Sequence, residues 1–339
     1  MLTLIVPGLI WTRQALADLT YDLPLPAFDT LLGKGRLLHR PPQSSAAILA
    51  EVAGLAAPLP VAALRWVAQG HPARRDDSGE WLCLDPVRLR FQERALVVDD
   101  PRQLRLDEAE AAALAVSLAP TLAHLGQLEV ISPQSWNLRL TTGAPPFEPL
   151  PEAAGRAAAA LPLDAAYAPW RHAISEAQML LHTHPVNQAR ETAGLPPVNS
   201  LWPWGGGRLP EFDNSAASSP HDIFWSDDPV AHGVARLLRI ASAALPPDFI
   251  DAAARAPLAI YDALDYPART GDALVWREQL SSFEDAWLAP ALHALRTGRL
   301  DALRLLAPSD LGAAELRISR HDLWKFWRKA GTLTELGPP

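Results

Sequence analysis

The sequence predicts an α/β protein with a mostly parallel sheet covered by helices and a small α+β domain inserted into it. In the second half of the chain, segments of helical and strand periodicity alternate, which is typical of a parallel sheet with crossover helices. Between two linker-like stretches at 71–79 and 143–151, the order is instead two strands, a helix and two strands. We therefore expect a core domain of residues 1–75 and 152–339 and an inserted domain of residues 76–151.

The first segment, Met1–Trp11, is apolar but too short to span a bilayer, and no basic segment precedes it. We expect it to be a core strand of a cytoplasmic protein. Helices are then predicted at 12–19, near Asp29, and from Ser44 or Ser45 to Gly54. In the inserted domain we expect strands at 82–89, 95–98, 128–131 and 136–140, with a helix from Asp107 to Gly126. Asp107 and Glu110 have the spacing of a capping box at the start of that helix.

The remaining chain is predicted to return to the parallel sheet. We expect helices at 170–183, 229–244 and 278–297, the last with a break at Pro290, and strands at 201–204, 258–262 and 303–306. A long loop at 205–222 follows the strand at 201–204. Ligands of parallel sheets bind at the carboxyl ends of strands, so this loop is expected to border a ligand site.

Composition limits the classes of function. A chain of 339 residues with 49% hydrophobic residues has enough apolar material for a large core. Its net charge of −8 and lack of a basic block argue against nucleic acid and anionic membrane surfaces as partners. A single cysteine, Cys83, excludes an internal disulfide framework and a cysteine-rich zinc site. No phosphate-binding P-loop, dinucleotide fingerprint or nucleophile elbow is present.

The most informative segment is 184–207, HPVNQARETAGLPPVNSLWPWGGG. Pro185 favours the first position of a helix, on which Asn187 and Arg190 lie one turn apart on the same face, and Gly194 is expected to end it. Three successive glycines then allow the backbone to turn sharply or to approach a ligand closely. The candidate ligand-binding residues in this segment are Asn187, Arg190, Asn199, Gly205 and Gly206.

This segment resembles the cofactor-independent phosphoglycerate mutases of the archaeal type, members of the alkaline phosphatase superfamily. Their pattern reads HPVN, R, G and PPAN, followed by WxWGxG or LxRGxG. Residues 2–9 (LTLIVPGL) and 25–35 (LPAFDTLLGKG) also resemble segments of that family. A still closer resemblance is to bacterial regulatory proteins of the RpfE type, at 81–89 (WLCLDPVRL), 136–140 (WNLRL) and 322–328 (DLWKFWR). The resemblance implies an alkaline-phosphatase-like core with an inserted α+β domain.

In that superfamily two divalent cations, held by Asp and His side chains, activate a serine or threonine nucleophile. The resemblance places Ser44 at the nucleophile position, and Asp265, Asp310 and His321 at metal-ligand positions. Pro7 stands where the first metal aspartate is expected, and Arg269 replaces a histidine ligand. Ser44 or Ser45 is equally suited to cap the following helix. A site that lacks these ligands is expected to bind a metal pair poorly, whereas Arg269 is suited to hold a phosphate or a carboxylate.

Three functions remain open at this point. The leading hypothesis is a non-catalytic binding or regulatory protein for a small phosphorylated or carboxylated metabolite, with a degenerate metal site and no cofactor. The second is an active phosphomutase or phosphohydrolase that uses Ser44 as nucleophile and binds Mn²⁺ or Zn²⁺. In the third, the 184–207 segment is architectural, and a protein partner binds the basic and aromatic C-terminal segment at 322–329. Trp204 stands where the second version of the family motif has arginine, which argues against phosphoglycerate itself as the substrate.

Overall fold

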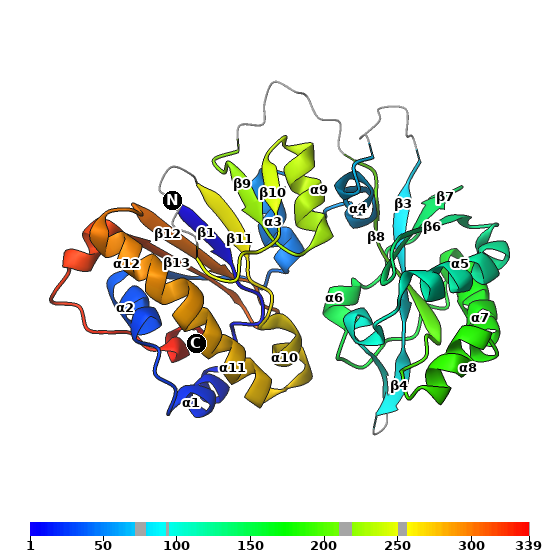
Figure 1. Ribbon diagram of the computed structural model, residues 1–339, viewed down its shortest axis with the longest axis horizontal. Coiled ribbons are helices and arrows are strands. Elements are labelled where there is room, and N and C mark those ends of the chain that lie inside the picture. The colour runs from blue at the N-terminus through cyan, green and yellow to red at the C-terminus, as the bar shows by residue number, and fades with distance from the viewer. Residues whose placement is uncertain (72–78, 93–94, 210–218, 250–255, 339) are drawn as a thin grey trace. The chain divides into compact units, whose positions relative to one another are not determined.

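The chain divides into two compact units. The first unit comprises residues 1–58 and 213–339, and the second comprises residues 59–212. The computed structural model describes residues 1–71, 79–92, 95–209, 219–249 and 256–338, and Figure 1 shows its helices and strands. The predicted linker at 71–79 and the predicted loop at 205–222 fall largely on 72–78 and 210–218, outside the described residues.

A seven-stranded sheet forms the centre of the first unit, with the strand order β10-β9-β11-β1-β12-β13-β2. Its strands are β1 (Leu2–Ile5), β2 (Arg36–Arg40), β9 (Ile223–Trp225), β10 (Ala241–Ala243), β11 (Pro257–Ile260), β12 (Ala302–Ala307) and β13 (Ala313–Ser319). The strands from β10 to β12 are parallel, whereas β13 and β2 are antiparallel to their neighbours. The predicted α/β fold with a mostly parallel sheet is confirmed.

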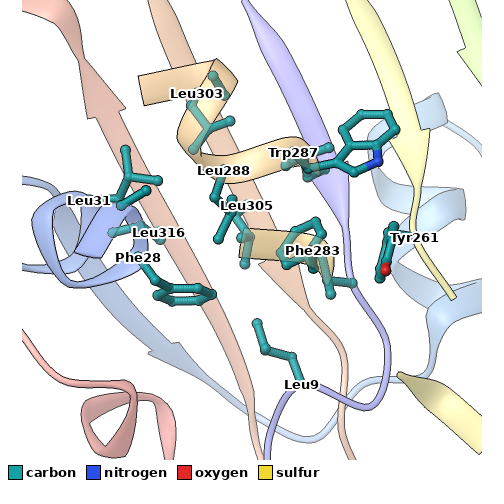
Figure 2. Packing of buried hydrophobic residues seen from close by; sticks show 14 of the residues in the cluster. Leu9, Phe28, Leu31, Tyr261, Phe283, Trp287, Leu288, Leu303, Leu305 and Leu316 are labelled. Carbon is teal, nitrogen blue, oxygen red and sulfur yellow. The ribbon is translucent and has the colours of Figure 1, made fainter. Parts of the chain in front are cut away.

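Apolar side chains hold helices against one face of this sheet. Figure 2 shows Phe28, Phe283 and Trp287 packed over Leu303 and Leu305. These three aromatic residues come from helix α2 (Pro26–Lys34), helix α11 (Ala273–Phe283) and the π turn at Glu284–Leu288 that joins α11 to helix α12 (Ala289–Thr297). Helix α3 (Ser45–Ala53) covers the opposite face, because strand side chains alternate and Arg304 reaches Glu51 of α3. The other helices of this unit are α1 (Arg13–Thr20), α9 (Pro229–Leu237) and α10 (Asp265–Thr270).

The second unit contains a separate antiparallel sheet with the order β6-β7-β3-β8 and a two-stranded β4-β5 ribbon. The strands are β3 (Trp81–Val87), β4 (Leu89–Gln92), β5 (Ala95–Val98), β6 (Gly126–Ser132), β7 (Ser135–Leu140) and β8 (Ser200–Gly207). The helices are α4 (Val61–Ala68), α5 (Glu108–Leu122), α6 (Leu150–Ala153), α7 (Ala168–His182) and α8 (Pro185–Thr192). Leu114 and Leu118 of α5 and Trp170 of α7 pack with Trp136 and Leu138 of the sheet in one core.

The strand predicted at 201–204 lies in a different sheet from the one expected. It forms part of β8, which pairs antiparallel with β3 across the register from Val87↔Ser200 to Cys83↔Trp204. Residues 152–209, expected in the core domain, therefore belong to the second unit, whose limits are wider than the predicted 76–151. An apolar strand of this length has no local signal that selects its partner strand, so the sequence did not distinguish the two sheets.

Two predicted helices also differ from the structure. The helix expected at 229–244 ends at Leu237, Arg239 has a φ of 58°, and β10 follows at Ala241–Ala243. A left-handed residue ends the helix, so the chain can turn back into the sheet. The α-helical run expected at 278–297 is interrupted just before Pro290 by the π turn at Glu284–Leu288, and Pro290 lies in the first turn of α12. Proline has no N–H to donate to the Ala286 carbonyl, which accepts a 2.9 Å hydrogen bond from Phe249 N instead. Within the described part of the chain, no helix combines the length and the apolar character needed to cross a membrane.

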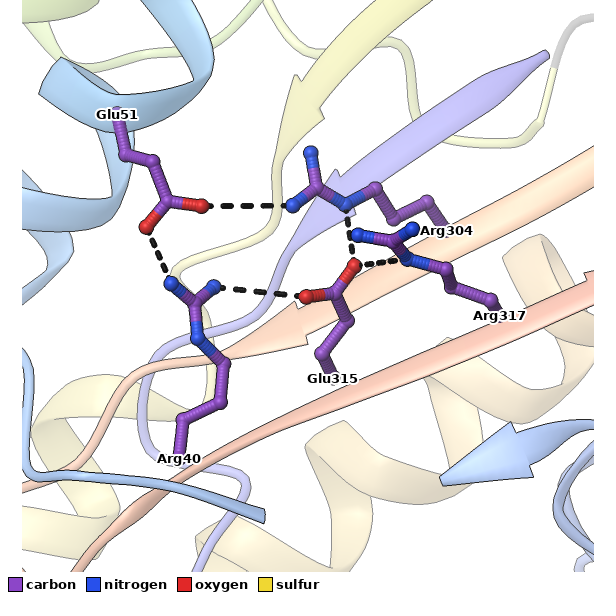
Figure 3. Close-up of polar contacts among 5 residues, drawn as sticks. All are labelled: Arg40, Glu51, Arg304, Glu315 and Arg317. Carbon is purple, nitrogen blue, oxygen red and sulfur yellow. Dashed lines mark hydrogen bonds and ion pairs between the residues drawn. The ribbon is translucent and has the colours of Figure 1, made fainter. Parts of the chain in front are cut away.

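Charged side chains on the α3 face of the sheet form one connected cluster (Figure 3). Glu315 of β13, with a side chain only 5% exposed, accepts a 2.7 Å hydrogen bond from Arg304 Nε and another from Arg317. Arg40 of β2 pairs with both Glu51 and Glu315. The cluster joins α3 to three strands, so its stability contributes to that of the whole sheet edge.

The free energy of unfolding is expected to decrease as the pH falls below 4.5, the ordinary pKa of glutamate. This cluster accounts for part of that decrease. Burial raises the pKa of Glu315, but hydrogen bonds from Arg304 and Arg317 outweigh it and hold that pKa below its usual value. The hydrogen bond from Arg40 lowers the pKa of Glu51. Both carboxyl groups bind fewer protons in the folded state than in the unfolded state. Their contribution to the free energy of unfolding is therefore complete at pH values above the pKa of the unfolded state, and it is lost as the pH falls through the pKa of the folded state.

Replacing Glu315 with glutamine should cost about 1.5–3 kcal/mol at neutral pH and flatten the acid limb of the stability curve. Denaturant unfolding from neutral to acid pH measures both effects. Glu284 works in the opposite direction, because burial raises its pKa, so the comparison must be between wild type and variant. The exposed Glu278→Gln is the control, and an acid limb of equal steepness in Glu315→Gln would contradict the assignment.

Candidate functional site

The carboxyl ends of three parallel strands meet at one edge of the seven-stranded sheet. Ile5 at the end of β1 is in register with Ile260 of β11 and with Leu306 of β12. The backbone continues this contact beyond the strands, since Tyr261 N donates to Ile5 O at 2.9 Å and Val6 N donates to Leu306 O at 2.8 Å. Ligand sites of parallel sheets lie at this edge, so it is the candidate functional site of the first unit.

Two predicted site residues, Ser44 and Asp310, are brought together at this edge. Gln43 and Ser309 form an isolated antiparallel bridge, in which Gln43 N donates to Ser309 O at 3.1 Å. Ser44 follows the first of these residues in the chain, and Asp310 follows the second. Ser44 is the N-cap of α3, where its hydroxyl accepts a 3.3 Å hydrogen bond from Ala47 N. The capping role expected for this serine is confirmed, and it uses the same hydroxyl that a nucleophile would need.

Asp265 begins α10, which follows β11 at the same edge, and Arg269 lies one turn later in the same helix. Arg269 Nη2 lies 2.6 Å from Asp265 Oδ2, and both side chains are largely or partly buried. The turn after β1 approaches this helix closely, because a Cβ on Gly8 would lie 2.5 Å from the Asp265 Cα. Gly8 has a φ of 76°, so glycine is required there both by conformation and by space.

His321 lies at the other end of the sheet. It belongs to the 3₁₀ helix Arg320–Trp324, which follows β13, and β13 runs antiparallel to β12. Ser319, the last residue of β13, is therefore opposite Ala302 at the beginning of β12. The structure brings Asp265 and Asp310 to the carboxyl edge and His321 to the amino edge, because the antiparallel strand between them reverses the chain.

The donor set at the carboxyl edge does not fit a pair of divalent cations. Pro7 supplies no side-chain ligand after β1, and Asp265 is already paired with the fixed positive charge of Arg269. Among the described residues, no group of three or more His, Cys, Asp and Glu side chains is placed to hold a metal ion. Hard cations need several anionic oxygens fixed together, and these residues do not provide them.

In the second unit, the two asparagines of the 184–207 segment bind backbone groups of the protein itself. Asn187 is 3% exposed; its Nδ2 donates to Leu181 O and Val198 O at 2.7 and 2.6 Å, and its Oδ1 accepts from Val198 N at 2.9 Å. Asn199 exchanges hydrogen bonds of 2.7 and 2.8 Å with the N–H and carbonyl of Leu89. Each asparagine side chain therefore supplies hydrogen bonds to backbone N–H and carbonyl groups of neighbouring segments.

Arg190 is also engaged within the second unit. The residue is 1% exposed, and its guanidinium donates to Pro196 O at 3.0 Å, to Leu104 O, and to Glu110 Oε2 at 2.6 Å. Glu110 is the capping-box residue of α5, whose predicted cap at Asp107 is confirmed. One buried arginine thus connects the start of α5 to the turn after α8.

The three glycines at the end of β8 approach other parts of the same unit. A Cβ on Gly205, which has a φ of 61°, would lie 2.9 Å from the Val61 Cβ, and one on Gly206 would lie 2.9 Å from Leu82 Cδ1. The close approach that glycine allows is therefore made to α4 and β3. The residues predicted around one ligand also belong to different units, since Asn187, Arg190 and the glycines lie in the second unit and Arg269 in the first.

The two solved structures most useful for comparison share this fold at low identity. A cofactor-independent phosphoglycerate mutase from Thermoplasma acidophilum DSM 1728 is 14% identical, with a TM-score of 0.50 over 98% of this chain and 93% of that chain. The PH0037 protein from Pyrococcus horikoshii is 14% identical, with a TM-score of 0.54 over 94% of this chain and 87% of that chain. The fold is phosphoglycerate-mutase-like. No protein-family model and no curated protein matches the sequence.

Within this phosphoglycerate-mutase-like fold, the sequence analysis did not identify the polar centre of the second unit. Asp85, 1% exposed, accepts hydrogen bonds from Arg65 Nη1 at 2.9 Å, from Trp136 N at 2.9 Å and from Trp204 Nε1 at 2.7 Å. The Arg65 guanidinium also lies 4.9 Å from the centre of a Trp204 ring. The sequence did contain a signal for this centre, because Asp85 is the one carboxylate within the largely apolar segment 81–89. A carboxylate buried with such a segment needs charged or hydrogen-bonding partners.

Proposed function

We propose that this phosphoglycerate-mutase-like protein binds a small phosphorylated or carboxylated metabolite without catalysing two-metal phosphoryl transfer. The ion pair between Asp265 and Arg269, at 2.6 Å, carries the proposal. Where the resemblance implies a cation between anionic ligands, a fixed guanidinium neutralises the carboxylate. A guanidinium presents a planar fork that fits phosphate and carboxylate, so a bound anion would share it with Asp265.

The geometry of the carboxyl edge supports an anion there. The N-terminus of α3, capped by Ser44, carries a partial positive charge that favours an anion. A regulatory role, as in the RpfE-type proteins, would follow if binding rather than turnover is the output. In the same proposal the 184–207 segment is architectural, because its asparagines, arginine and glycines are occupied by the protein's own groups.

Saturating inorganic phosphate is expected to raise the stability of the wild-type protein, by about 2.7 kcal/mol at a hundred times the dissociation constant. Arg269→Ala should lose this shift, whereas Arg13→Ala, on an exposed arginine of the same unit, should keep it. Titration with Mn²⁺ should give no stoichiometric binding. Stoichiometric Mn²⁺ that disappears in Asp310→Ala, together with phosphomonoester turnover that disappears in Ser44→Ala, would instead establish the metal-dependent enzyme.

A protein-interaction module is a second candidate function, favoured by the exposure of aromatic side chains near the C-terminus. Trp324 is 80% exposed, Phe326 88% and Trp327 69%. Large aromatic side chains gathered at one exposed place are typical of surfaces that another molecule covers.

A further inference from the structure

A groove with a volume of about 560 Å³ lies beside these aromatic residues in the first unit. One wall is the end of α12, from Leu295 to Gly298, and the other is the segment from Arg320 to Phe326. Leu295, Leu323, Trp324 and Phe326 provide its apolar lining. The groove therefore offers a concave surface that combines apolar side chains, two of them exposed rings, with polar groups.

The aromatic segment at 322–329 is held in place by its backbone. Lys34 Nζ, at the end of α2, donates to Lys325 O at 2.7 Å and to Arg328 O at 2.5 Å. Arg328 Nη1 donates in return to Gly35 O at 2.7 Å, and Asp322 forms a capping box with Ser319. Because the backbone is fixed while the rings remain exposed, little conformational entropy would be lost when a partner covers them.

The ionisable side chains that line the groove are all basic. Arg296, Arg320 and His321 line it, and the nine described lining residues include no carboxylate. Two acidic side chains close in sequence to these segments are paired with basic ones: Asp322 with Lys325 at 2.5 Å, and the exposed Asp301 with the lining residue Arg320 at 3.8 Å. A carboxylate of a partner would compete with Asp301 for Arg320. The end of α12 contributes only the partial negative charge of a helix C-terminus, which two arginines outweigh.

We propose that this groove binds an acidic segment of a partner protein that inserts an apolar side chain between Leu323, Trp324 and Phe326. Carboxylates of the segment would contact Arg296 and Arg320, and its apolar side chain would fill the concave surface. This inference rests on the protein-interaction function proposed above and specifies the chemistry of the partner. Aromatic and arginine side chains in partly desolvated pockets supply most of the affinity of such interfaces.

The experiment selects a random-peptide phage library on the full-length protein and removes peptides that also bind the Trp324→Ser/Phe326→Ser variant, in which two exposed lining residues are replaced. The peptides that remain are expected to combine Asp or Glu with Leu, Phe or Trp. A selected peptide, measured by fluorescence polarisation, should bind Arg320→Glu about tenfold or more weakly than wild type and should lose affinity with rising salt. Tyr21→Ser, on another exposed aromatic residue of the first unit, should bind like wild type.

Each outcome separates this inference from the function on which it rests. Groove-dependent peptides without acidic enrichment, or unaffected by Arg320→Glu, would overturn the acidic partner but retain the interaction module. Absence of any groove-dependent peptide would overturn both. Groove-dependent sedimentation with phosphatidylserine vesicles in place of peptide binding would assign the surface to a membrane. Concentration-dependent self-association that is lost in Trp324→Ser/Phe326→Ser would assign it to a second copy. The replaced side chains are exposed, so thermal unfolding should confirm that the variants fold.

Discussion

Replacing Asp85 with alanine is expected to lower the free energy of unfolding of the second unit by about 3–5 kcal/mol. The carboxylate is 1% exposed and is shared by Arg65, the Trp136 backbone N–H and the Trp204 indole. Its removal leaves the buried guanidinium without its counter-charge and two N–H donors without an acceptor. Hydrogen exchange of β3, β7 and β8, read by mass spectrometry, measures the loss in this unit separately from the first.

Asp85→Asn distinguishes charge from shape in this cluster. The amide retains the size of the carboxylate and one acceptor oxygen, but it does not neutralise Arg65. The free energy of unfolding is therefore expected to decrease clearly, though less than in Asp85→Ala. Asp164→Ala is the matched control, because that aspartate is exposed and accepts no capping hydrogen bond. Equal protection of β3 in wild type and Asp85→Ala would contradict a central structural role for this carboxylate.

Replacing Arg190 with alanine is the second large effect, also expected to cost about 3–5 kcal/mol. The variant loses hydrogen bonds to the carbonyls of Leu104 and Pro196 and leaves Glu110 without its arginine. Because Glu110 also accepts from Asp107 N, the start of α5 should lose protection as well. Exchange of α5 and α8, measured together, reports this coupling.

The control for Arg190 is the adjacent exposed Glu191→Ala, which should change stability by about 0.5 kcal/mol or less. A double-mutant cycle with Glu110→Gln measures the ion pair itself. If Arg190 instead serves a ligand, Arg190→Ala will retain wild-type stability and lose the stabilisation by phosphate. That result would return the 184–207 segment to the binding site.

Local signals in the sequence predicted local structure. The capping box of Asp107 and Glu110, the cap at Ser44 and the helix that begins at Pro185 are all present, because each depends on residues within one turn. Asn187 and Arg190 are buried on one face of α8, as their spacing predicted. The spacing could not predict which groups this face contacts, and they are backbone carbonyls and the Glu110 side chain.

The sequence by itself determined the α/β class, the apolar strands, the helix caps and the unusual cluster of Pro, Asn, Arg and Gly at 184–207. The tertiary structure alone decided that β8 pairs with β3, that the cluster's polar groups are used by the protein itself, and that His321 is carried away from Asp265 and Asp310. The physical reason is that caps and periodicity act between neighbours in the chain. Strand partners and the occupants of a buried polar face are chosen by residues far away in sequence.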